Sequence, residues 1–564
     1  MDNANLTFVL TILGLILLFY FLGRAEQRRQ LQRQLRLLKY SFGVSPAKKV
    51  SLERFQLIPR YFEKHRLKNQ LDDITWDDLD MDEIYTRIDR THSAAGEEYL
   101  YFLLRTPLPD GADPLLDEAA VSYFEDPSHE QERLRLEMCF ARAGRSDKYS
   151  LYDYLDHLDT LGERPLMKHL PFLILPVLAL LLMFASSQAV LLLIAVFAFS
   201  LISYYPEKRK IEPYIVSFRY LLRLMNSADE IVKTEDGSVF AKEKQILREK
   251  TKALSSFRRG SFLLSRGDGF ASGNPFDFLL DYLLIFFHID LLKFDQMLRE
   301  VRNKDGDIDA LVTALGKMDT TISVSSFRRS LPYYCRPRFD ASRIFLEEEE
   351  LYHPLLKAPV PNSFRTTNSM LITGSNASGK STFLRAVAIS CILAQTLHTV
   401  CARDYCANRF RVFSAMSLND DLLKGESYFM VEIKAIKRIL DAAKEESPYP
   451  VLCFVDEVLR GTNTIERIAA STEILKTMGE EKLLCFAATH DLELTKMLDG
   501  LYTNVHFTEE MAGEDITFPY KLQEGPAVSR NAILLLQNMG YEKDIVTGAR
   551  NRAEHFEESG VWAL

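Results

Sequence analysis

The stretch that decides the fold is Gly374-Ser375-Asn376-Ala377-Ser378-Gly379-Lys380-Ser381. It fits the pattern G-x-x-x-x-G-K-[ST], follows a short apolar run at residues 370–373, and opens a helical pattern near Thr382. Glycines let backbone N–H groups converge on phosphate oxygens, and the N-terminus of a helix adds partial positive charge. Residues 374–382 therefore predict a phosphate-binding loop, in which Lys380 reaches the outer phosphates of a nucleotide and Ser381 ligates Mg²⁺.

An acidic pair, Asp456-Glu457, follows the apolar run at residues 451–455. At the end of a buried strand, such a pair is the expected partner of a phosphate loop. Asp456 would hold Mg²⁺, directly or through water, and Glu457 would orient or deprotonate the attacking water. Alone, the pair would fit two exposed carboxylates as well, but the phosphate loop upstream favours the catalytic interpretation.

A third apolar run, at residues 483–488, ends in Thr489-His490. A histidine at the tip of a strand can sense a γ-phosphate through an N–H donor, although a lone histidine is more often structural. With two phosphate motifs upstream, we expect His490 to act in catalysis together with Lys380 and Glu457. Short apolar strands that alternate with helical stretches also predict an α/β domain with a mainly parallel sheet.

The composition is that of a folded, multidomain protein. The chain has 564 residues, of which 47% are hydrophobic and 26% charged. Its formal net charge of −9 argues against an overall basic coat for nucleic acid, although a local basic face is compatible with an acidic total. The seven cysteines include no C-x-x-C pair, so neither a disulfide framework nor a zinc site is expected, and a reducing compartment fits best.

Two uncharged stretches predict three transmembrane helices. Residues 6–22 would span about 26 Å as a helix and are followed by several arginines. Residues 170–205 are too long for one crossing and divide at Ser186-Ser187-Gln188 into two halves, with basic residues at both ends. By the positive-inside rule, the N-terminus lies outside and the other soluble parts are cytoplasmic. The alternatives are a signal peptide for the first stretch and buried core helices for the second.

These observations predict a multi-pass protein of the plasma (inner) membrane with five parts. They are an N-terminal anchor at residues 1–23, a cytoplasmic helical region at 24–169, an apolar helical hairpin at 170–205, a second helical region at 206–344 and an α/β P-loop domain at 345–564. The two helical regions show apolar residues at three- and four-residue spacing and are interrupted by prolines.

Together with a Gly-x-Ser segment at residues 425–427, these motifs resemble the ATPase domain of the MutS family of DNA mismatch-repair proteins, which belongs to the ABC-like ATPase class. The resemblance covers about residues 350–550 and is carried by Val360-Pro361-Asn362, Asn376, Asp420-Asp421-Leu422, Gly425, Ser427, Phe429-Met430, Glu432, Asp456-Glu457, Arg460-Gly461-Thr462, Thr464 and Ala488-Thr489-His490. More weakly, residues 78–107 resemble the start of the family's helical core, and residues 322–334 resemble its end.

The resemblance implies an ATPase that binds ATP and Mg²⁺ at composite sites of a homodimer, with Ser427 contacting the phosphates bound by the other subunit. ATP would favour the closed dimer, and hydrolysis would release it and switch a helical core of the DNA-binding type. The ATPase domain departs modestly from the family, since Leu459 replaces a usual Gly, Asn463 a usual Ser and Cys401 a usual Pro.

A larger departure lies in the N-terminal half. The family's mismatch-reading domain has no room in this chain, which argues against mismatch recognition, although the resemblance implies mismatched-DNA binding, DNA mismatch repair and ATP-dependent DNA damage sensing. The hairpin at residues 170–205 interrupts the shortened helical core, and we expect it to take the place of the DNA clamp that the family inserts there.

The sequence does not identify the ligand of the helical core. The stretch 242–266 holds the basic residues Lys242, Lys244, Arg248, Lys250, Lys252, Arg258, Arg259 and Arg266. They could contact DNA phosphates without sequence preference, bind anionic membrane lipid, or form a solvated helical face. The leading hypothesis is a membrane-anchored MutS-like ATPase with DNA as ligand. The alternatives are the same ATP-driven dimer switch acting on a protein or membrane partner and, less favoured, a transporter-associated ATPase.

Overall fold

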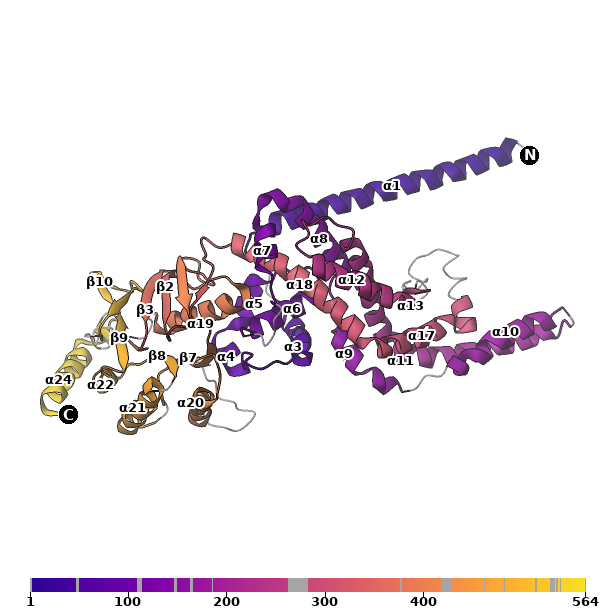
Figure 1. Cartoon of the computed structure of the whole chain (residues 1–564). Helices are drawn as coiled ribbons and strands as arrows, with labels where there is room; N and C mark the ends of the chain where they lie inside the picture. The colour runs from indigo at the N-terminus through magenta and orange to yellow at the C-terminus, as the bar shows by residue number, and fades with distance from the viewer. Residues whose placement is uncertain are drawn as a thin grey trace. The chain divides into compact units, whose positions relative to one another are not determined.

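The computed structural model describes the chain except for residues 1–2, 47–49, 109–113, 147–149, 163–165, 185, 262–281, 376–377, 417–427, 461, 481, 513–514, 528–532, 534–535, 538 and 563–564 (Figure 1). The chain divides into two compact units. Unit 1 consists of Met1–His65, Ile88–Phe102 and Asp117–Ser330, and unit 2 of Arg66–Arg87, Leu103–Leu116 and Leu331–Leu564. Two short N-terminal segments therefore belong to the same unit as the C-terminal half.

Unit 1 is built from helices. They include α1 (Asn3–Ser41), α2 (Leu52–Phe55), α3 (Arg60–Lys64), α7 (Glu118–Glu125), α8 (Glu130–Ala143), α9 (Leu151–Asp156), α10 (Leu170–Leu182), α11 (Ala189–Ile231), α12 (Ala241–Ala253), α13 (Ser255–Arg258), α17 (Ile289–Asn303) and α18 (Asp305–Arg329), while α5 (Met81–Ile88) and α6 (Ala94–Arg105) run from one unit into the other. The core forms around α18, which packs against α7, α8 and α12 and buries every residue from Met318 to Arg328.

One helix in the described part of the chain is long and apolar enough to cross a membrane, and it is α11. The shorter apolar helix at Met167–Leu182 is separated from α11 at residues 183–188, where the sequence predicts a break. Residues 6–22 lie within α1, but the side chains up to residue 20 are outside the described part. Three transmembrane helices are therefore not supported, because within the described residues length and composition qualify α11 alone, and the prediction for residues 6–22 lies largely outside them.

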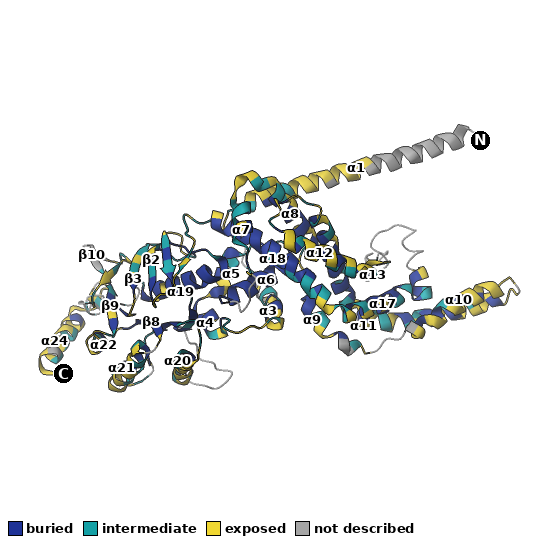
Figure 2. Cartoon of the chain, viewed as in Figure 1, coloured by how far each residue is buried: buried dark blue, intermediate teal, exposed yellow. Residues whose placement is uncertain are grey.

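The apolar side chains of α10 and of the first part of α11, residues 189–205, are largely exposed (Figure 2). Leu191 is 71% exposed and Ile202 75%, and Phe184 in the connection between the helices is 93% exposed. Only 22% of the most apolar window of α11 is buried. Core helices of a soluble protein would bury these side chains, so the alternative of a buried pair is disfavoured.

Unit 2 contains a six-stranded sheet in the order β12-β9-β4-β8-β7-β6. Its strands are β12 (Leu522–Glu524), β9 (Tyr502–Phe507), β4 (Ser369–Thr373), β8 (Leu483–Ala488), β7 (Val451–Asp456) and β6 (Arg411–Ala415). All neighbours run parallel except β12, which pairs antiparallel with β9. The sheet is therefore mainly parallel, as the sequence predicts.

A second, four-stranded sheet in unit 2 has the order β1-β5-β2-β3. It comprises β1 (Arg338–Phe339), β5 (Asp404–Ala407), β2 (Leu346–Leu351) and β3 (Asn362–Thr366), and a separate pair is formed by β10 (Glu510–Ala512) and β11 (Asp515–Thr517). The helices of the unit are α4 (Asp73–Asp78), α19 (Lys380–Leu397), α20 (Tyr428–Lys444), α21 (Thr464–Glu480), α22 (Leu492–Met497) and α24 (Lys543–Ser559).

The central strands are apolar on both faces because helices cover the six-stranded sheet on both sides (Figure 1). Every residue of β4 and β8 is buried, and Phe454 of β7 stacks on Phe486 of β8 with ring centroids 5.5 Å apart. α19 packs on one face, and α20 and α21 pack on the other, where their apolar side chains meet Leu371. This burial fixes the positions of the strand ends.

Candidate functional site

The site lies at the carboxyl ends of three neighbouring strands. β4, β8 and β7 are adjacent and parallel, so the segments that follow them meet at one edge of the sheet. Those segments are the phosphate loop after β4, Thr489-His490 after β8 and Glu457 after β7. Backbone bonds hold them together: Thr489 N donates to Ile372 O at 3.0 Å, and Glu457 N donates to Ala488 O at 2.9 Å.

Two glycines of the phosphate loop adopt backbone conformations that other residues rarely reach. Gly374 has φ +146°, and a Cβ there would lie 2.8 Å from the carbonyl oxygen of Phe507. Gly379 has φ +105° and directly precedes α19, where a Cβ would lie 3.1 Å from the Tyr520 ring. The loop can therefore follow this path only with glycine at both positions.

Lys380 is buried against its own loop. Its Nζ donates to the carbonyl oxygens of Gly374 and Ser375, both at 2.8 Å, and lies 3.3 Å from His490 Nε2. Burial lowers the pKa of Lys380, and the negative charges of Asp456 and Glu457 oppose that shift. The ammonium group is held at the loop by carbonyl dipoles that phosphate oxygens could replace.

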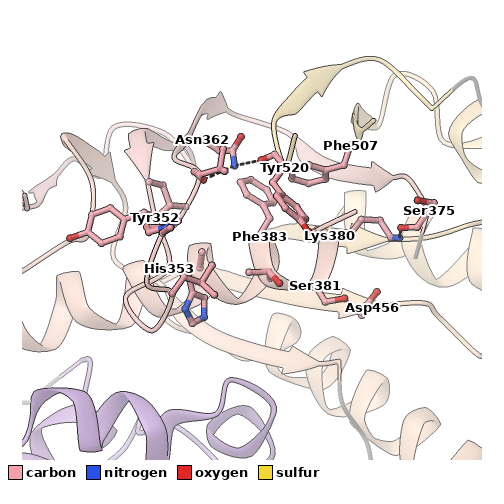
Figure 3. Close-up of a pocket in the computed structure, with 18 of the residues that line it drawn as sticks. Tyr352, His353, Asn362, Ser375, Lys380, Ser381, Phe383, Asp456, Phe507 and Tyr520 are labelled. Carbon is pink, nitrogen blue, oxygen red and sulfur yellow. Dashed lines mark hydrogen bonds between the residues drawn. The ribbon is translucent and has the colours of Figure 1, made fainter. Parts of the chain in front are cut away.

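Ser381 and Asp456 form the part of the site that could hold a metal. Ser381 Oγ donates to Asp456 Oδ2 at 2.5 Å (Figure 3). Burial raises the pKa of Asp456 above its usual range, and a bound cation would reverse that effect. One hydroxyl and one carboxylate fit Mg²⁺, which usually takes one or two protein oxygens and completes its shell with phosphate and water.

Glu457 is held between two cationic or hydrogen-bonding side chains. Its Oε1 lies 2.8 Å from His490 Nε2, and its Oε2 lies 2.7 Å from Arg460 Nε. The hydrogen bond from His490 lowers the pKa of Glu457 most, with smaller contributions from the charges of Arg460 and Lys380. Glu457 is therefore an ionised carboxylate at neutral pH, beside the loop.

Glu432 of α20 holds the backbone that follows Glu457. Its buried Oε1 accepts a hydrogen bond from Leu459 N at 2.5 Å. Leu459 has φ +58°, which explains the glycine that the MutS family usually has there. A left-handed conformation costs a non-glycine residue about 1–2 kcal/mol, whereas burying a leucine side chain contributes about 1.5–3 kcal/mol. The 5% exposed Leu459 side chain thus offsets the backbone strain.

A cavity of about 470 Å³ adjoins the loop and extends away from the catalytic residues (Figure 3). One part of its lining is apolar and aromatic, with Tyr352, Leu356, Pro359, Val360, Phe383, Phe507 and Tyr520, of which Phe507 and Tyr520 lie beside the loop. The other part is polar, with Ser375, Lys380, Ser381, Thr382, Asp456 and Glu457. The cavity therefore offers a surface for a flat apolar ring beside one for phosphates.

Two polar residues shape the apolar part of the cavity lining. Asn362 Nδ2 donates to Tyr520 O at 3.0 Å, and Asn362 Oδ1 accepts from Leu522 N at 2.8 Å, so this amide holds the Tyr520 segment over the cavity. Burial lowers the pKa of His353 to about 4, which keeps this cavity-lining imidazole neutral at pH 7. The resemblance to the MutS family already includes Asn362. The aromatic residues that line the cavity belong to no motif in the sequence.

The described structure thus brings together Gly374, Ser375, Ser378, Gly379, Lys380, Ser381, Thr382, Asp456, Glu457 and His490. Asn376, Ala377 and Ser427 lie outside the described residues. Their expected roles as phosphate-loop donors and as a contact to a second subunit therefore stay predictions.

Residues 370–557 match the family described as MutS domain V. The chain is 30% identical over 282 residues to the DNA mismatch repair protein MutS of Protochlamydia amoebophila, a match that covers 47% of this chain and 32% of that protein. It is 32% identical over 222 residues to the DNA mismatch repair proteins MutS of Thermus thermophilus and Thermus aquaticus, with 38% of this chain and 26% of each relative covered. The chain thus matches only a third or less of the length of these curated relatives.

The fold and the site define a P-loop nucleotide-binding domain of the α/β class. The matched residues identify that domain as a member of the family described as MutS domain V, so the resemblance to the MutS family that the motifs predict is confirmed for this part of the chain.

Proposed function

We propose that this protein binds and hydrolyses ATP with Mg²⁺ at the edge of the six-stranded sheet. The observation that carries the proposal is that two sets of side chains meet at one loop. Ser381 contacts Asp456, and His490 contacts both Lys380 and Glu457, all at distances of 3.3 Å or less. A chance glycine loop would not place an ionised carboxylate, a buried lysine and a hydroxyl–carboxylate pair around one loop.

The residues of the chain divide the work of hydrolysis. Lys380 exchanges its two loop carbonyls for β- and γ-phosphate oxygens, so its charge meets the charge of the transition state. Glu457 accepts a proton from the attacking water, and His490 orients that carboxylate and can donate to the γ-phosphate. Ser381 and Asp456 would hold Mg²⁺, which would supply positive charge to the phosphates. The apolar part of the cavity lining receives the adenine ring of ATP.

We further propose a homodimer with composite sites, in which Ser427 of one subunit completes the site of the other. The support comes from the family resemblance and from exposed apolar side chains around this region. Met430 of α20 is 46% exposed, and Ile465 at the start of α21 is 80% exposed. A second subunit would cover such side chains when ATP closes the dimer.

The proposed output is a change in the helical unit, with DNA as the candidate ligand. The name of the relatives supports DNA, but they are matched over only 26–32% of their length. The basic stretch gives weaker support, because Lys244, Lys250 and Arg258 pair with acidic residues of the same unit. This pairing favours a switch that acts on a protein or membrane partner as the second candidate.

We propose that the chain is held in the plasma (inner) membrane, with the ATPase domain cytoplasmic. The exposed apolar faces of α10 and the first part of α11 support this proposal, because a soluble protein rarely exposes so large an apolar surface to water. Charged pairs stand at the base of these helices, where Lys168 meets Glu207 at 2.9 Å and Lys208 meets Asp290 at 2.7 Å. They fit the polar side of a membrane boundary.

Hydrolysis is tested by phosphate release from the full chain in detergent. Glu457→Gln should lower kcat at least about 100-fold because it removes the base, while nucleotide binding persists. Lys380→Ala should weaken ATP binding itself. Lys476→Ala, an exposed lysine of α21, is the matched control and should behave as wild type. Unchanged phosphate release in both variants would contradict the assignment of these residues to ATP hydrolysis.

The pH profile of kcat tests the contact between Glu457 and His490. A base must be ionised, so the acidic limb of the profile follows the pKa of Glu457, which His490 lowers. His490→Ala should therefore move the acidic limb to higher pH, besides lowering the maximal rate. His506→Ala is a suitable control, since His506 Nδ1 pairs with Gly525 O instead. An acidic limb that stays in place after His490→Ala would exclude this role.

DNA binding is tested by measuring affinity against salt concentration with matched and mismatched duplexes. Binding to phosphates should give a linear fall of log K with log salt, with a slope of about −0.9 per phosphate contacted, and no preference for mismatches. Arg248→Ala and Lys252→Ala, on an exposed part of α12, should each reduce the slope by about one. A flat salt dependence would leave the protein or membrane partner as the ligand.

Membrane anchoring is tested by extracting membranes that contain the full chain with alkaline carbonate. The chain should stay in the pellet, because the apolar faces of α10 and α11 are stable only in lipid. A variant with Leu191→Asp and Ile202→Asp should be released in part, whereas Ile465→Asp in unit 2 should not change retention. Release of the wild-type chain would refute the anchor.

A further inference from the structure

The strand end that carries His490 is held through the residues on either side of it. Thr489 N donates to Ile372 O of β4 at 3.0 Å, and Asp491 N donates to Thr489 Oγ1 at 3.0 Å. The His490 side chain itself is 35% exposed, so packing against other side chains restrains it little. Its place beside Glu457, at 2.8 Å, therefore depends on how firmly its two neighbours in the chain are held.

An arginine of α21 anchors the residue after His490. Arg467 lies in the first turn of α21, and its guanidinium group binds both oxygens of the Asp491 carboxylate. Nε donates to Oδ2 at 3.0 Å, and Nη2 donates to Oδ1 at 2.7 Å. A bidentate pair fixes the direction of the two side chains as well as the distance between them. Both side chains are partly buried, at 25% and 17% exposure, so water screens the pair less than one on the open surface.

Asp491 gives up its usual local role for this contact. It is the N-cap residue of α22, where an aspartate normally accepts a hydrogen bond from a backbone N–H group of the first turn. Here the side chain makes no such cap bond, and its two oxygens accept from Arg467 instead. The carboxylate therefore joins two elements rather than capping its own helix.

The same helix also holds the backbone beside Glu457. Ser471 of α21 is fully buried, and its Oγ donates to the carbonyl oxygen of Val458 at 3.1 Å. Arg467 and Ser471 are four residues apart, so they lie on one face of α21, one turn from each other. That face thus supports the residue after Glu457 and, through Arg467, the residue after His490.

We propose that Arg467 is a positioning residue for His490 and acts through Asp491. The first two turns of α21 then form a common support that keeps the Glu457 carboxylate and the His490 imidazole in contact. This assignment rests on the hydrolysis proposed above, in which His490 orients Glu457. Arg467 itself touches neither the nucleotide nor the phosphate loop in this arrangement, and its effect on the rate is transmitted by the chain.

Arg467 also acts on Glu457 through space. The pKa of Arg467 is raised, chiefly by its bond to Asp491 and less by the negative charge of Glu457. Loss of the guanidinium can therefore change the ionisation of Glu457 in two ways, through a displaced His490 or through a missing charge. Only the first way disappears when the imidazole is absent.

The first test measures ATP hydrolysis by the full chain in detergent. Arg467→Met should lower kcat about tenfold with KM for ATP within about twofold, because the phosphate loop is intact. The acidic limb of the pH profile of kcat should move to higher pH, since a displaced His490 no longer lowers the pKa of Glu457. Arg467→Lys keeps the charge without the two-pronged geometry and should give an intermediate rate. An unchanged rate and acidic limb in Arg467→Met would overturn the assignment.

A matched control removes an ion pair elsewhere in the same unit. Lys437 of α20 pairs with Asp441 at 2.6 Å on the exposed surface. Lys437→Met should therefore behave as wild type. A loss of rate equal to that of Arg467→Met would show that the effect is not specific to the pair beside His490.

A double-mutant cycle with His490→Ala shows whether Arg467 acts through His490. In the His490→Ala background, Arg467→Met should change kcat by less than about twofold and leave the acidic limb in place, because no imidazole remains to be positioned. A purely structural role, or a direct effect of the charge on Glu457, would lower the rate by the same factor in both backgrounds. Equal losses in both backgrounds would overturn the assignment.

Asp491→Ala provides an independent variant and separates the possible failures. It should reproduce the effects of Arg467→Met, and the two changes together should be no slower than either alone. If Arg467→Met does not fold, the same cycle with Asp491→Ala decides. If His490→Ala lowers kcat while Arg467→Met and Asp491→Ala do not, only the positioning role is overturned. If His490→Ala leaves the rate of an active protein unchanged, the proposed role of His490 and this assignment fall together.

Discussion

The structure depends on the parallel alignment of β4, β8 and β7, whose buried faces fix three strand ends at one edge of a sheet. Each strand is apolar on both faces, so its register is set by packing against helices on both sides. Lys380, Glu457 and His490 follow three different strands, and their close contacts exist only because those ends coincide. A slip of one strand would separate the carboxylate from the loop that it serves.

Much of this site could be predicted from the sequence because each part has a local cause. The glycines at 374 and 379 mark unusual backbone angles, and an acidic pair after a buried strand marks a strand end. The order of strands brings these motifs together, and only the structure shows that order. The family resemblance identified Glu432, but only the structure shows that it binds the strained backbone at Leu459.

Other features have no local signature in the sequence. The aromatic wall of the cavity comes from residues far apart in the chain, of which Tyr352 and Tyr520 are examples, and each alone is an ordinary apolar residue. Asp78 accepts hydrogen bonds from Ser414 and Met416, more than 300 residues away, and an aspartate in a short acidic helix gives no hint of these contacts. Hydropathy predicts three apolar helices, whereas the described part of the chain qualifies only α11, because α10 is short and the side chains of residues 6–20 lie outside that part.

The insertion of Arg66–Arg87 into unit 2 has a consequence for dissecting the protein. A fragment cut at residue 331 would keep the whole P-loop sheet in sequence but would lack α4. The Ser414 amide of β6 would then lack its Thr75 acceptor, and an uncovered strand edge readily pairs with another copy. The C-terminal half is thus a domain by sequence homology whose edge strand is covered by a segment more than 300 residues earlier in the chain.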